Sequence, residues 1–469
     1  MTGFTPPYPK LSLPKSKLLR KLMLPWLAIK SRHCAIAMIP EGGYRMMVSE
    51  VKLPGGAALF PIDPEVVRRV LVEESEDFPK SVIVADTLGL LLGDSIFVSN
   101  GEVWKRQRRM MNPAFAHTRV KVVFDMMLEA ADAMMERLDT VADGRVVDVE
   151  EEMTLVTADI IFRTIFSRPL QKDEAEVIFK AFRTYQESAF ALGLNRTMRL
   201  PEWMSFLTFR RARDTAKIIR AALDPIVARR HASFHAGERQ VHNDILQSLV
   251  SVKDEETGTY FDLRELCEQV AMLFLAGHET SASALSSSLY LLSHDQDVQN
   301  RVHAETVEAL GGRALTFSDL RKLDLTRNVF AEALRLFPPV PFLPREARKT
   351  CPIRNKVAKA GSIVSISPWL IHRSRSQWLN PDLFDPDRFS RPETRDAERQ
   401  CYIPFSKGPR VCLGASFALQ EATIILASIA RRYRLACEPG FVPKLRGRLT
   451  IRSANGIRLR LTRRDPAPV

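Results

Sequence analysis

The stretch Phe405-Ser406-Lys407-Gly408-Pro409-Arg410-Val411-Cys412-Leu413-Gly414 decides the fold of this chain. Its cysteine has an arginine two positions before it and a glycine two positions after it, and an apolar helical run over 415–430 follows directly. A thiol at the start of a helix, beside a fixed cation, is favoured as the thiolate. A thiolate on such a loop can ligate a soft or borderline metal from one side. The alternative for a lone cysteine is a small buried side chain that opens a helix.

The composition is that of a globular protein with a large core. The 469 residues are 45% hydrophobic and 26% charged, and 68 Lys and Arg against 55 Asp and Glu give a net charge of +13. No zinc spacing, phosphate loop or aromatic-interleaved basic stripe accompanies this charge, so the sequence does not favour nucleic acid as a partner. The six cysteines form no CxxC pair, which favours reduced thiols and a cytoplasmic protein.

The first 35 residues predict a lead segment without a transmembrane anchor. The longest apolar stretch there, 22–29, is broken by Pro25 and is far shorter than the roughly 20 residues of a spanning helix. Residues 15–30 mix basic and apolar side chains, so we expect a peripheral membrane contact at most. The remaining residues, 36–469, are expected to form a single soluble domain.

Periodicity predicts a mainly helical chain with a smaller β portion. Strand patterns lie at 44–51, 57–62 and 361–367, and a helix is expected over 63–74, where Asp63-Pro64 is a good start. From 102 to about 292 the pattern is almost entirely helical. A closing hairpin is expected over 446–462 around Asn455-Gly456.

Five fixed positions of the opening stretch resemble the haem-thiolate signature of the cytochrome P450 monooxygenases: Phe405, Gly408, Arg410, Cys412 and Gly414. The resemblance implies one long domain of a soluble, bacterial-like member, with haem between a long central helix and the cysteine loop. Cys412 would ligate the haem iron, Phe405 would pack on the thiolate side, and Arg410 would pair with a haem propionate. Gly408 and Gly414 would let the backbone approach the sulfur and the ring.

The expected helix over 263–292 carries Ala276-Gly277-His278-Glu279-Thr280. A mid-helix glycine costs roughly 1 kcal/mol relative to alanine and invites a reason, such as close approach of another group. The alternative is a helix-packing glycine with Glu279 facing solvent. The segment resembles the acid–alcohol pair of the family, in which Thr280 would hydrogen-bond the iron-bound oxygen and Glu279 would help to relay protons. Ala276 and Gly277 would then lie against the haem, and because Ala276 replaces a glutamate that bonds covalently to haem in one branch, we expect non-covalent haem b. His278 is expected to be an ordinary core or surface histidine.

Further motifs resemble the haem-supporting parts of the family. Glu332, Arg335 and Arg388 match a structural triad, for which an ordinary ion pair on one helix face is the alternative. Trp104 and Arg108, four residues apart, match propionate-binding positions, although a cation–π pair on a solvated face would have the same spacing. Arg345 matches a further propionate contact.

The resemblance implies a monooxygenase that inserts one atom of O2 into a hydrophobic molecule, such as a lipid or terpenoid. Electrons would come from a separate acidic ferredoxin or flavodoxin with its reductase, steered by a basic rim of Lys105, Arg106, Arg109 and Lys407. A peroxide-using hydroxylase or isomerase of the same fold, and a non-catalytic haem-thiolate sensor, remain alternatives.

Substrate contacts are expected from about 81–99 and 182–209, although ordinary core packing explains the apolar residues of these ranges equally well. Within the second range, the stretch 200–206 and the arginines around it have two interpretations, an access channel or a membrane contact.

Overall fold

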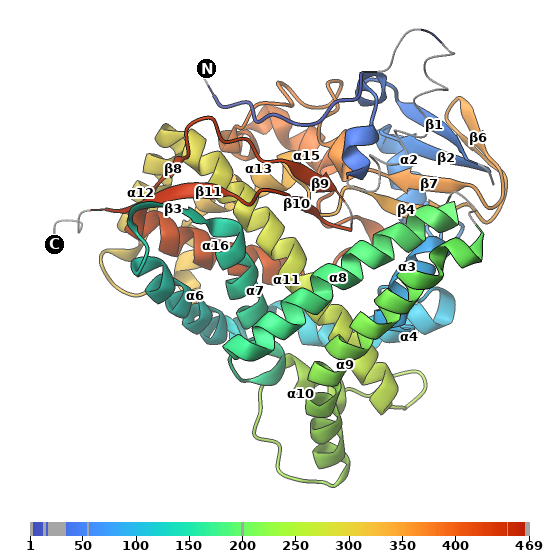
Figure 1. Cartoon of the computed structure of the whole chain (residues 1–469), viewed down its shortest axis with the longest axis horizontal. Coiled ribbons are helices and arrows are strands. Elements are labelled where there is room, and N and C mark those ends of the chain that lie inside the picture. The colour runs from blue at the N-terminus through green and yellow to red at the C-terminus, as the bar shows by residue number, and fades with distance from the viewer. Residues whose placement is uncertain are drawn as a thin grey trace.

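A long helix, α11 (Leu263–His294), runs through the centre of the molecule, with other helices around it and strands on two sides (Figure 1). The computed structural model describes residues 3–12, 16, 34–53, 56–197, 201–447 and 449–464. The mainly helical character with a smaller β portion, predicted from the sequence, is confirmed.

The helices of the described residues account for most of the chain. They are α2 (Pro64–Arg68), α3 (Val82–Leu92), α4 (Gly101–Met111), α5 (His117–Val122), α6 (Phe124–Asp139), α7 (Val149–Phe166), α8 (Lys172–Thr197), α9 (Phe206–His235), α10 (Ile245–Ser251), α11, α12 (Gln296–Leu310), α13 (Asp324–Leu336), α14 (Pro368–Ile371), α15 (Arg395–Cys401) and α16 (Ala415–Arg432). The strands are β1 (Val48–Leu53), β2 (Gly56–Pro61), β3 (Asp143–Asp148), β4 (Leu343–Glu346), β5 (Cys351–Ile353), β6 (Lys356–Ala358), β7 (Ile363–Ile366), β8 (Tyr433–Cys437), β9 (Leu445–Gly447), β10 (Ile451–Ser453) and β11 (Arg458–Arg463).

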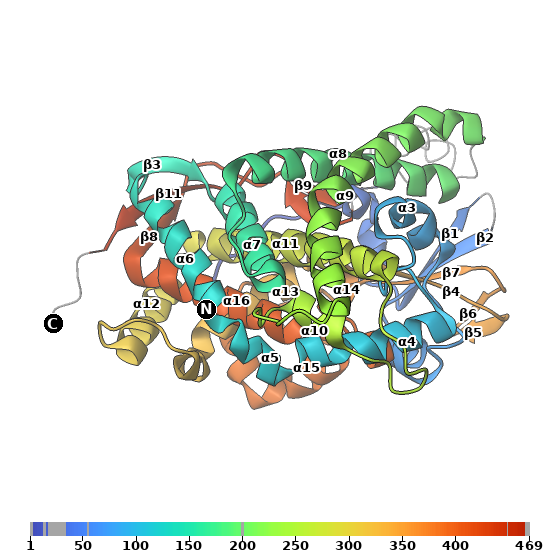
Figure 2. The same ribbon diagram turned by 90° about the horizontal axis from the view of Figure 1, so that it is seen from below.

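Local sequence explains where α11 begins and why it stays in the core. Asp262 accepts a hydrogen bond from the backbone N–H of Glu265, and the Glu265 side chain accepts one from the backbone N–H of Asp262. This capping box satisfies two amide groups that the first turn would otherwise leave free. Helices α7 and α9 then cross over α11, as Figure 2 shows from below, and α8 packs against α9.

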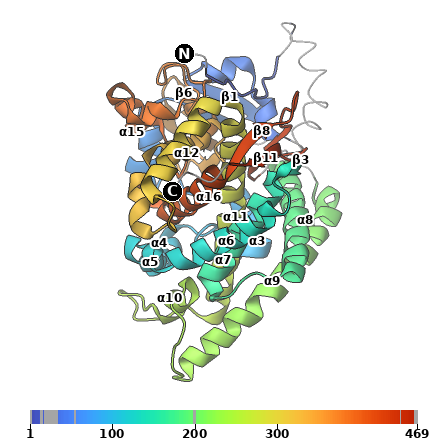
Figure 3. The same ribbon diagram turned by 90° about the vertical axis from the view of Figure 1, so that its left-hand side faces the viewer.

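Two sheets flank the helices. The four-stranded sheet has the order β1-β2-β7-β4, in which β2 and β7 are parallel and the other pairs are antiparallel. The three-stranded sheet has the order β3-β11-β8 and is seen at the near side in Figure 3. β5 pairs with β6, and β9 pairs with β10. The predicted strands near 48, 58 and 363 are confirmed, as is the helix that begins after Asp63, which caps it.

The predicted hairpin around Asn455-Gly456 is wrong. β10 pairs back onto β9, whereas β11 lies between β3 and β8, so the Asn-Gly pair connects two different sheets. Gly456 has φ +70°, and a Cβ there would lie 1.9 Å from a carboxylate oxygen of Asp148. Asp148 also accepts from the backbone N–H of Ile457 at 2.9 Å. The glycine is therefore explained by a tight corner against β3.

The N-terminal residues that are described pack against the domain. The ring of Phe4 stacks on that of His294 with centroids 4.0 Å apart, and Leu11 donates its backbone N–H to Ile39 at 3.1 Å. The basic and apolar segment 15–30 lies, apart from Ser16, outside the described residues. No helix in the described part of the chain has the length and hydropathy needed to cross a membrane.

Candidate active site

The cysteine loop is fixed by backbone contacts at both of its ends. Cys412 donates its backbone N–H to the carbonyl oxygen of Phe405 at 2.9 Å, and α16 begins three residues after the cysteine, with Gly414 as its N-cap. Gly408 has φ +72°, and a Cβ there would lie 2.2 Å from the carbonyl oxygen of Leu71. Only glycine fits this position, because any side chain would push the loop away from the Leu71 backbone.

The surroundings of the Cys412 thiol differ from those expected. Burial raises the pKa of the thiol, while the backbone N–H of Gly414 and the guanidinium of Arg108 act in the opposite direction. The cation near the sulfur is therefore Arg108 and not Arg410, and burial outweighs it. Although protein surrounds the thiol, the Cys412 side chain is exposed. A side chain with both properties lines an opening inside the protein.

The middle of α11 presents a second accessible surface inside the molecule. Between residues 266 and 286 every residue is buried except Ala276, Gly277 and Thr280, and Thr280 lies four positions after Ala276 and three after Gly277, on the same side of the helix. The Thr280 hydroxyl donates to the carbonyl oxygen of Ala276 at 2.7 Å. A Cβ on Gly277 would lie 2.4 Å from the Ile161 side chain of α7, so helix packing accounts for this glycine.

Glu279 lies on the buried side of the same helix turn and does not face solvent. The hydroxyl of Thr450 donates to its Oε2 at 3.1 Å, and Nη1 of Arg452 lies 3.7 Å from the same oxygen. Burial acts to raise the pKa of Glu279, but Arg452 and His278 outweigh it and hold that pKa below its ordinary value. The carboxylate is thus charged, buried and held by groups from outside α11.

His278 is a core histidine, as expected. Its side chain is 1% exposed, its Nδ1 lies 2.7 Å from the carbonyl oxygen of Phe274, and burial lowers its pKa. The described residues hold no group of three or more His, Cys, Asp or Glu side chains that could bind a metal ion.

One hydrogen bond joins α11 to the helix that follows the cysteine loop. The hydroxyl of Ser281, next to Thr280, donates to Oε2 of Glu421 on α16 at 2.8 Å. Helix α11, which carries the accessible face, is therefore in direct contact with α16, the helix that follows the cysteine loop.

A cluster of cations lies beside the cysteine loop, and Lys80 belongs to it. Nη1 of Arg108 donates to the carbonyl oxygen of Val411 at 2.7 Å, and Arg410 stacks 5.2 Å above the ring of Trp104. Burial, together with Arg410, Arg345 and Arg108, lowers the pKa of Lys80 to about 6. Burial and Arg410 lower that of Arg345 to about 10.

This cluster fits a buried dianion such as the two propionates of haem. Positive charge removed from water is costly unless an anion accompanies it. Carbonyl oxygens serve the cations instead: Lys80 donates to Ile96 at 2.6 Å and to Ser99 at 2.8 Å, and Arg410 to Ser75 at 2.6 Å. Nε of Arg410 is buried without a hydrogen-bond partner. Trp104, Arg108, Arg345 and Arg410, singled out from the sequence, are thus brought together.

Lys80 escaped the sequence analysis because no spacing marks it. It stands alone between Pro79 and Ser81, at the start of α3 and 24 positions before Trp104. The isolated bridge between Lys80 and Arg345 of β4, together with the contact of its ammonium with the Trp104 ring at 5.9 Å, brings Lys80 to the cluster. The only indication in the sequence that Lys80 belongs to the site is that it precedes an apolar helix, which is a weak indication.

Glu332, Arg335 and Arg388 form a buried ion cluster under the loop. Nε of Arg335 donates to Glu332 at 2.7 Å, and Nε of Arg388 donates to the same carboxylate at 3.1 Å. Arg335 also donates to the carbonyl oxygen of His372 at 2.8 Å, and His372 accepts from the backbone N–H of Ile403 at 3.0 Å. The cluster is therefore connected to the start of the cysteine loop.

Three of the four cations of the expected basic rim, Lys105, Arg106 and Arg109, are paired with acids. Lys105 lies 3.1 Å from Glu76 and 3.0 Å from Glu102, and Arg106 lies 2.6 Å from Glu265. Arg109 contacts Asp254 and Glu256, while Lys407 donates to the carbonyl oxygens of Arg399 and Gln400. Counting positive residues in the sequence overlooked acidic partners that come from distant segments.

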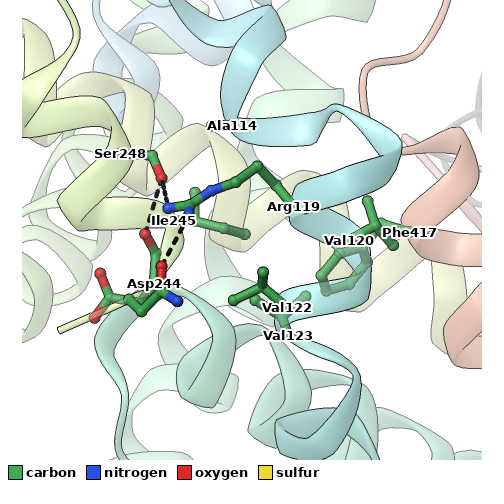
Figure 4. Close-up of a pocket in the computed structure, with 10 residues that line it drawn as sticks. Ala114, Arg119, Val120, Val122, Val123, Asp244, Ile245, Ser248 and Phe417 are labelled. Carbon is green, nitrogen blue, oxygen red and sulfur yellow. Dashed lines mark hydrogen bonds between the residues drawn. The ribbon is translucent and has the colours of Figure 1, made fainter. Parts of the chain in front are cut away.

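The two segments expected to contact substrate pack against each other. The hydroxyl of Tyr185 on α8 donates to the carbonyl oxygen of Leu88 on α3 at 3.1 Å, and the ring of Phe182 on α8 stacks on that of Phe274 on α11 with centroids 5.4 Å apart. Both segments thus adjoin the middle of α11. A separate small pocket, shown in Figure 4, lies beside Phe417 between α5 and α10. Its Arg119 is hydrogen-bonded to Asn243 at 2.8 Å, and the lining of this pocket includes none of the site residues above.

Comparison with known proteins finds the same family by sequence and by structure. The family model described as Cytochrome P450 matches residues 47–454. In solved structures, a crystal structure of the cytochrome P450DA heme domain superposes with a TM-score of 0.79 at 26% identity, covering 90% of each chain.

The similar curated proteins include bacterial terpenoid-oxidising enzymes. Cyclooctatin synthase of Streptomyces melanosporofaciens is 33% identical over 391 residues, covering 83% of each chain. Cyclooctat-9-en-7-ol 5-monooxygenase of the same organism is 32% identical over 397 residues, also covering 83% of each. Pentalenene oxygenase of Streptomyces avermitilis is 28% identical over 420 residues, covering 89% of this chain and 90% of that protein.

Proposed function

The chain belongs to the cytochrome P450 family of monooxygenases, and from this premise we propose that it hydroxylates a terpenoid or a similar hydrophobic molecule. The observation that carries the proposal is the accessible face of α11, with Thr280 at its centre, on a helix joined to the cysteine loop through Ser281 and Glu421. The relatives whose names state terpenoid products or substrates support the substrate class.

The residues around the loop are suited to hold haem b without a covalent bond. Cys412 would supply the sulfur ligand to iron, and the cluster of Lys80, Arg108, Arg345 and Arg410 would bind the propionates. Ala276 offers no carboxylate for a covalent attachment. Haem held by a thiolate supplies reductive activation of O2 and transfer of one oxygen atom to a C–H bond, while the other atom leaves as water.

The protein side of the reaction is proton delivery and exclusion of water. Glu279 carries a charge inside the protein and can take up a proton at Oε2, the oxygen that Thr450 contacts. Thr280 holds its hydroxyl on the accessible face, next to Ala276, where it can pass a proton into the site. The apolar side chains of α3 and α8 adjoin this face and would hold a hydrophobic substrate.

Electrons would come from a separate ferredoxin or flavodoxin with its reductase. Because Lys105, Arg106 and Arg109 are paired with acids, the docking of such a partner does not rest on those cations. We place the reaction in the cytoplasm, where the unpaired state of the six cysteines is the usual one. Residues 36–469 would act as one domain.

A peripheral membrane contact is suggested by one apolar patch. Trp203, Phe206 and Leu207 are 77%, 62% and 77% exposed, and Met204 and Phe209 lie beside them. The exposed Arg210, Arg211 and Arg213 follow on α9. Aromatic and aliphatic side chains beside arginines are typical of a surface that rests on lipid, from which a hydrophobic substrate can enter.

The test combines a spectrum with a labelling experiment. Reduced, CO-bound protein should show the absorption band of a thiolate ligand, which Cys412→Ala should abolish and the control Cys437→Ala should retain. With ferredoxin, its reductase, NADPH and a panel of terpene hydrocarbons and alcohols, 18O2 should place one labelled atom in the product. A histidine-type spectrum would refute the haem assignment.

The same assay separates the alternatives. Hydroxylation that requires hydrogen peroxide and ignores 18O2 would identify a peroxide-using enzyme. Unlabelled rearranged product would identify an isomerase, and substrate-induced spectral shifts without any turnover would identify a sensor. Thr280→Ala should lower the product formed per NADPH with O2 because it removes the hydroxyl that passes protons.

A further inference from the structure

We propose that the N-terminal segment 3–12, here called the strap, positions the cysteine loop through Arg373 and its neighbour His372. In Figure 1 the strap is the dark blue trace that starts at the label N. The consequence for haem retention rests on the proposed function, whereas the coupling between the strap and the loop is a property of the polypeptide alone.

Arg373 is a buried cation that the strap helps to enclose. The residue is 2% exposed, and its guanidinium lies 3.8 Å from the centre of the Trp369 ring and 4.7 Å from that of the Tyr8 ring. Its Nη1 donates to the carbonyl oxygen of Trp369 at 3.3 Å, and its Nη2 donates to that of Leu336. Because these acceptors carry no charge, the faces of the two rings compensate the guanidinium for the water that it has lost.

Tyr8 is held over Arg373 by contacts of its own. The rings of Tyr8 and Tyr44 lie with centroids 5.5 Å apart. The hydroxyl of Tyr44 donates to the carbonyl oxygen of Pro9 at 3.3 Å and accepts from Nε1 of Trp369 at 3.0 Å. The strap therefore completes an aromatic cage, formed by Tyr8, Tyr44 and Trp369, around the cation.

The strap also holds the backbone of 381–384. Phe384 donates its backbone N–H to the carbonyl oxygen of Phe4 at 2.9 Å. Within the same segment, the carbonyl oxygens of Pro381 and Leu383 accept from Arg335 at 2.6 Å and 3.1 Å. The strap thus lies on the segment that supplies acceptors to the buried ion cluster.

His372 connects these contacts to the start of the cysteine loop. It directly precedes Arg373, is fully buried, and its carbonyl oxygen accepts from Arg335 at 2.8 Å. Its Nδ1 lies 3.2 Å from the carbonyl oxygen of Arg335, and its Nε2 accepts from the backbone N–H of Ile403 at 3.0 Å. This pair of contacts requires the neutral ring with its proton on Nδ1.

From Ile403 the backbone hydrogen bonds continue to the cysteine. Ser406 donates its backbone N–H to the carbonyl oxygen of Ile403 at 3.1 Å, and Cys412 donates to that of Phe405 at 2.9 Å. Ser406 has φ +66°, a left-handed conformation that serine keeps only where other contacts hold it. The loop is therefore strained at Ser406 and depends on the anchor at Ile403.

Loss of the strap is expected to loosen this anchor. Without Tyr8, water would reach Arg373, and its guanidinium would no longer depend on the carbonyl oxygens at the ends of α13 and α14. Because His372 lies between α14 and Arg373, its ring would then move more freely, and the hydrogen bond to Ile403 would open more often.

Hydrogen exchange measures the coupling without any haem chemistry. Tyr8→Ala should speed the exchange of the backbone amides of 400–412 about tenfold, because the loop opens more often. Tyr8→Phe keeps a ring over Arg373 and should restore the wild-type protection. Phe234→Ala, which removes a partly buried ring from α9, is the matched control and should leave 400–412 as in the wild type.

A peptide added in trans tests whether the strap acts as a separate element. In mild urea, protein that lacks residues 1–12 should lose the CO-bound absorption band of the thiolate ligand about tenfold faster than the wild type. A synthetic peptide with the sequence of residues 1–12 should slow this loss. The same peptide with Tyr8→Ala should not.

The inference is overturned if Tyr8→Ala leaves the exchange of 400–412 unchanged, if Phe234→Ala speeds it equally, or if the peptide has no effect. Wild-type protein without a thiolate band would instead contradict the proposed haem binding. Hydrogen exchange needs no haem and would still report on the strap in that case.

Discussion

Lys80 lies in surroundings that differ from those of an ordinary exposed lysine. It lies among three arginines, and burial is the main reason why its pKa falls to about 6. Bound propionates would supply the missing negative charge and keep the ammonium protonated. The buried Lys80 ammonium is unfavourable without a neighbouring anion. Because the propionates would supply that anion, Lys80 would help to retain the haem.

Lys80→Met is expected to speed the loss of haem about tenfold, because one charge-assisted contact is removed. The measurement is the rate of haem transfer to apomyoglobin. Lys52→Met, which removes an exposed lysine from β1, should leave the rate unchanged. Equal rates in all three proteins would show that Lys80 does not contact the cofactor.

Some residues of the candidate site could be predicted from the sequence and others could not. Cys412 and Arg108 lie in spaced motifs and Arg345 matches a single position, and the structure brings Arg108 and Arg345 to one cluster beside the cysteine loop. Arg452 and Lys80 belong to no motif, because their roles depend on strands that meet residues far away in the chain. The acidic partners of Arg106 and Arg109 lie more than 140 positions away, so these ion pairs could not be predicted from local sequence.

At the scale of elements, the contact between α11 and α16 depends on a carboxylic acid. Burial raises the pKa of Glu421 to about 8, although the hydrogen bond from Ser281 acts in the opposite direction. Its Oε1 is buried without a partner. At neutral pH the native protein therefore holds a proton on Glu421 that the unfolded chain, with an ordinary pKa of 4.5, releases.

Stability should accordingly fall as pH rises between about 4.5 and 8, because the unfolded state binds fewer protons in this window. Glu421→Gln removes the titrating group, so its free energy of unfolding relative to wild type should increase from pH 5 to pH 8 by on the order of a few kcal/mol. Urea titrations at several pH values measure this difference. The exposed Glu151→Gln is the control, and a difference independent of pH would contradict the expectation.

The elements themselves were predictable where their signal is local. Asp63 before Pro64 marks the start of α2, and the long apolar pattern from 263 marks α11. The hairpin predicted from Asn455-Gly456 was wrong because a local turn signal does not determine which strands will pair. The choice between β9 and β11 as the partner of β10 is made by tertiary packing of Gly456 against Asp148.

On the scale of the whole molecule, the apolar patch of Trp203, Met204, Phe206, Leu207 and Phe209 is the feature that sets how the protein meets its surroundings. Exposed apolar groups gathered at one place mark an interaction surface, whereas single ones do not. The arginines beside the patch favour an anionic lipid surface.

The double variant Trp203→Ser with Leu207→Ser should lower binding to vesicles of anionic phospholipid about tenfold or more, because two large side chains no longer enter the lipid. Flotation of vesicles with bound protein measures the effect. Val241→Ser removes a side chain that is 75% exposed outside the patch and should bind as the wild type does. Wild-type protein that stays with the unbound fraction would refute the membrane contact.

The contacts of the cysteine loop with the early part of the chain have a consequence for biosynthesis. Gly408 rests on the backbone of Leu71, Arg410 donates to Ser75, and Val411 accepts from Arg108. More than 300 residues separate the partners, so the cysteine loop cannot take its final shape on the ribosome until nearly the entire polypeptide has emerged. If the loop holds haem as proposed, haem binding would be a late, post-translational event, and a truncated or stalled chain would be released without cofactor.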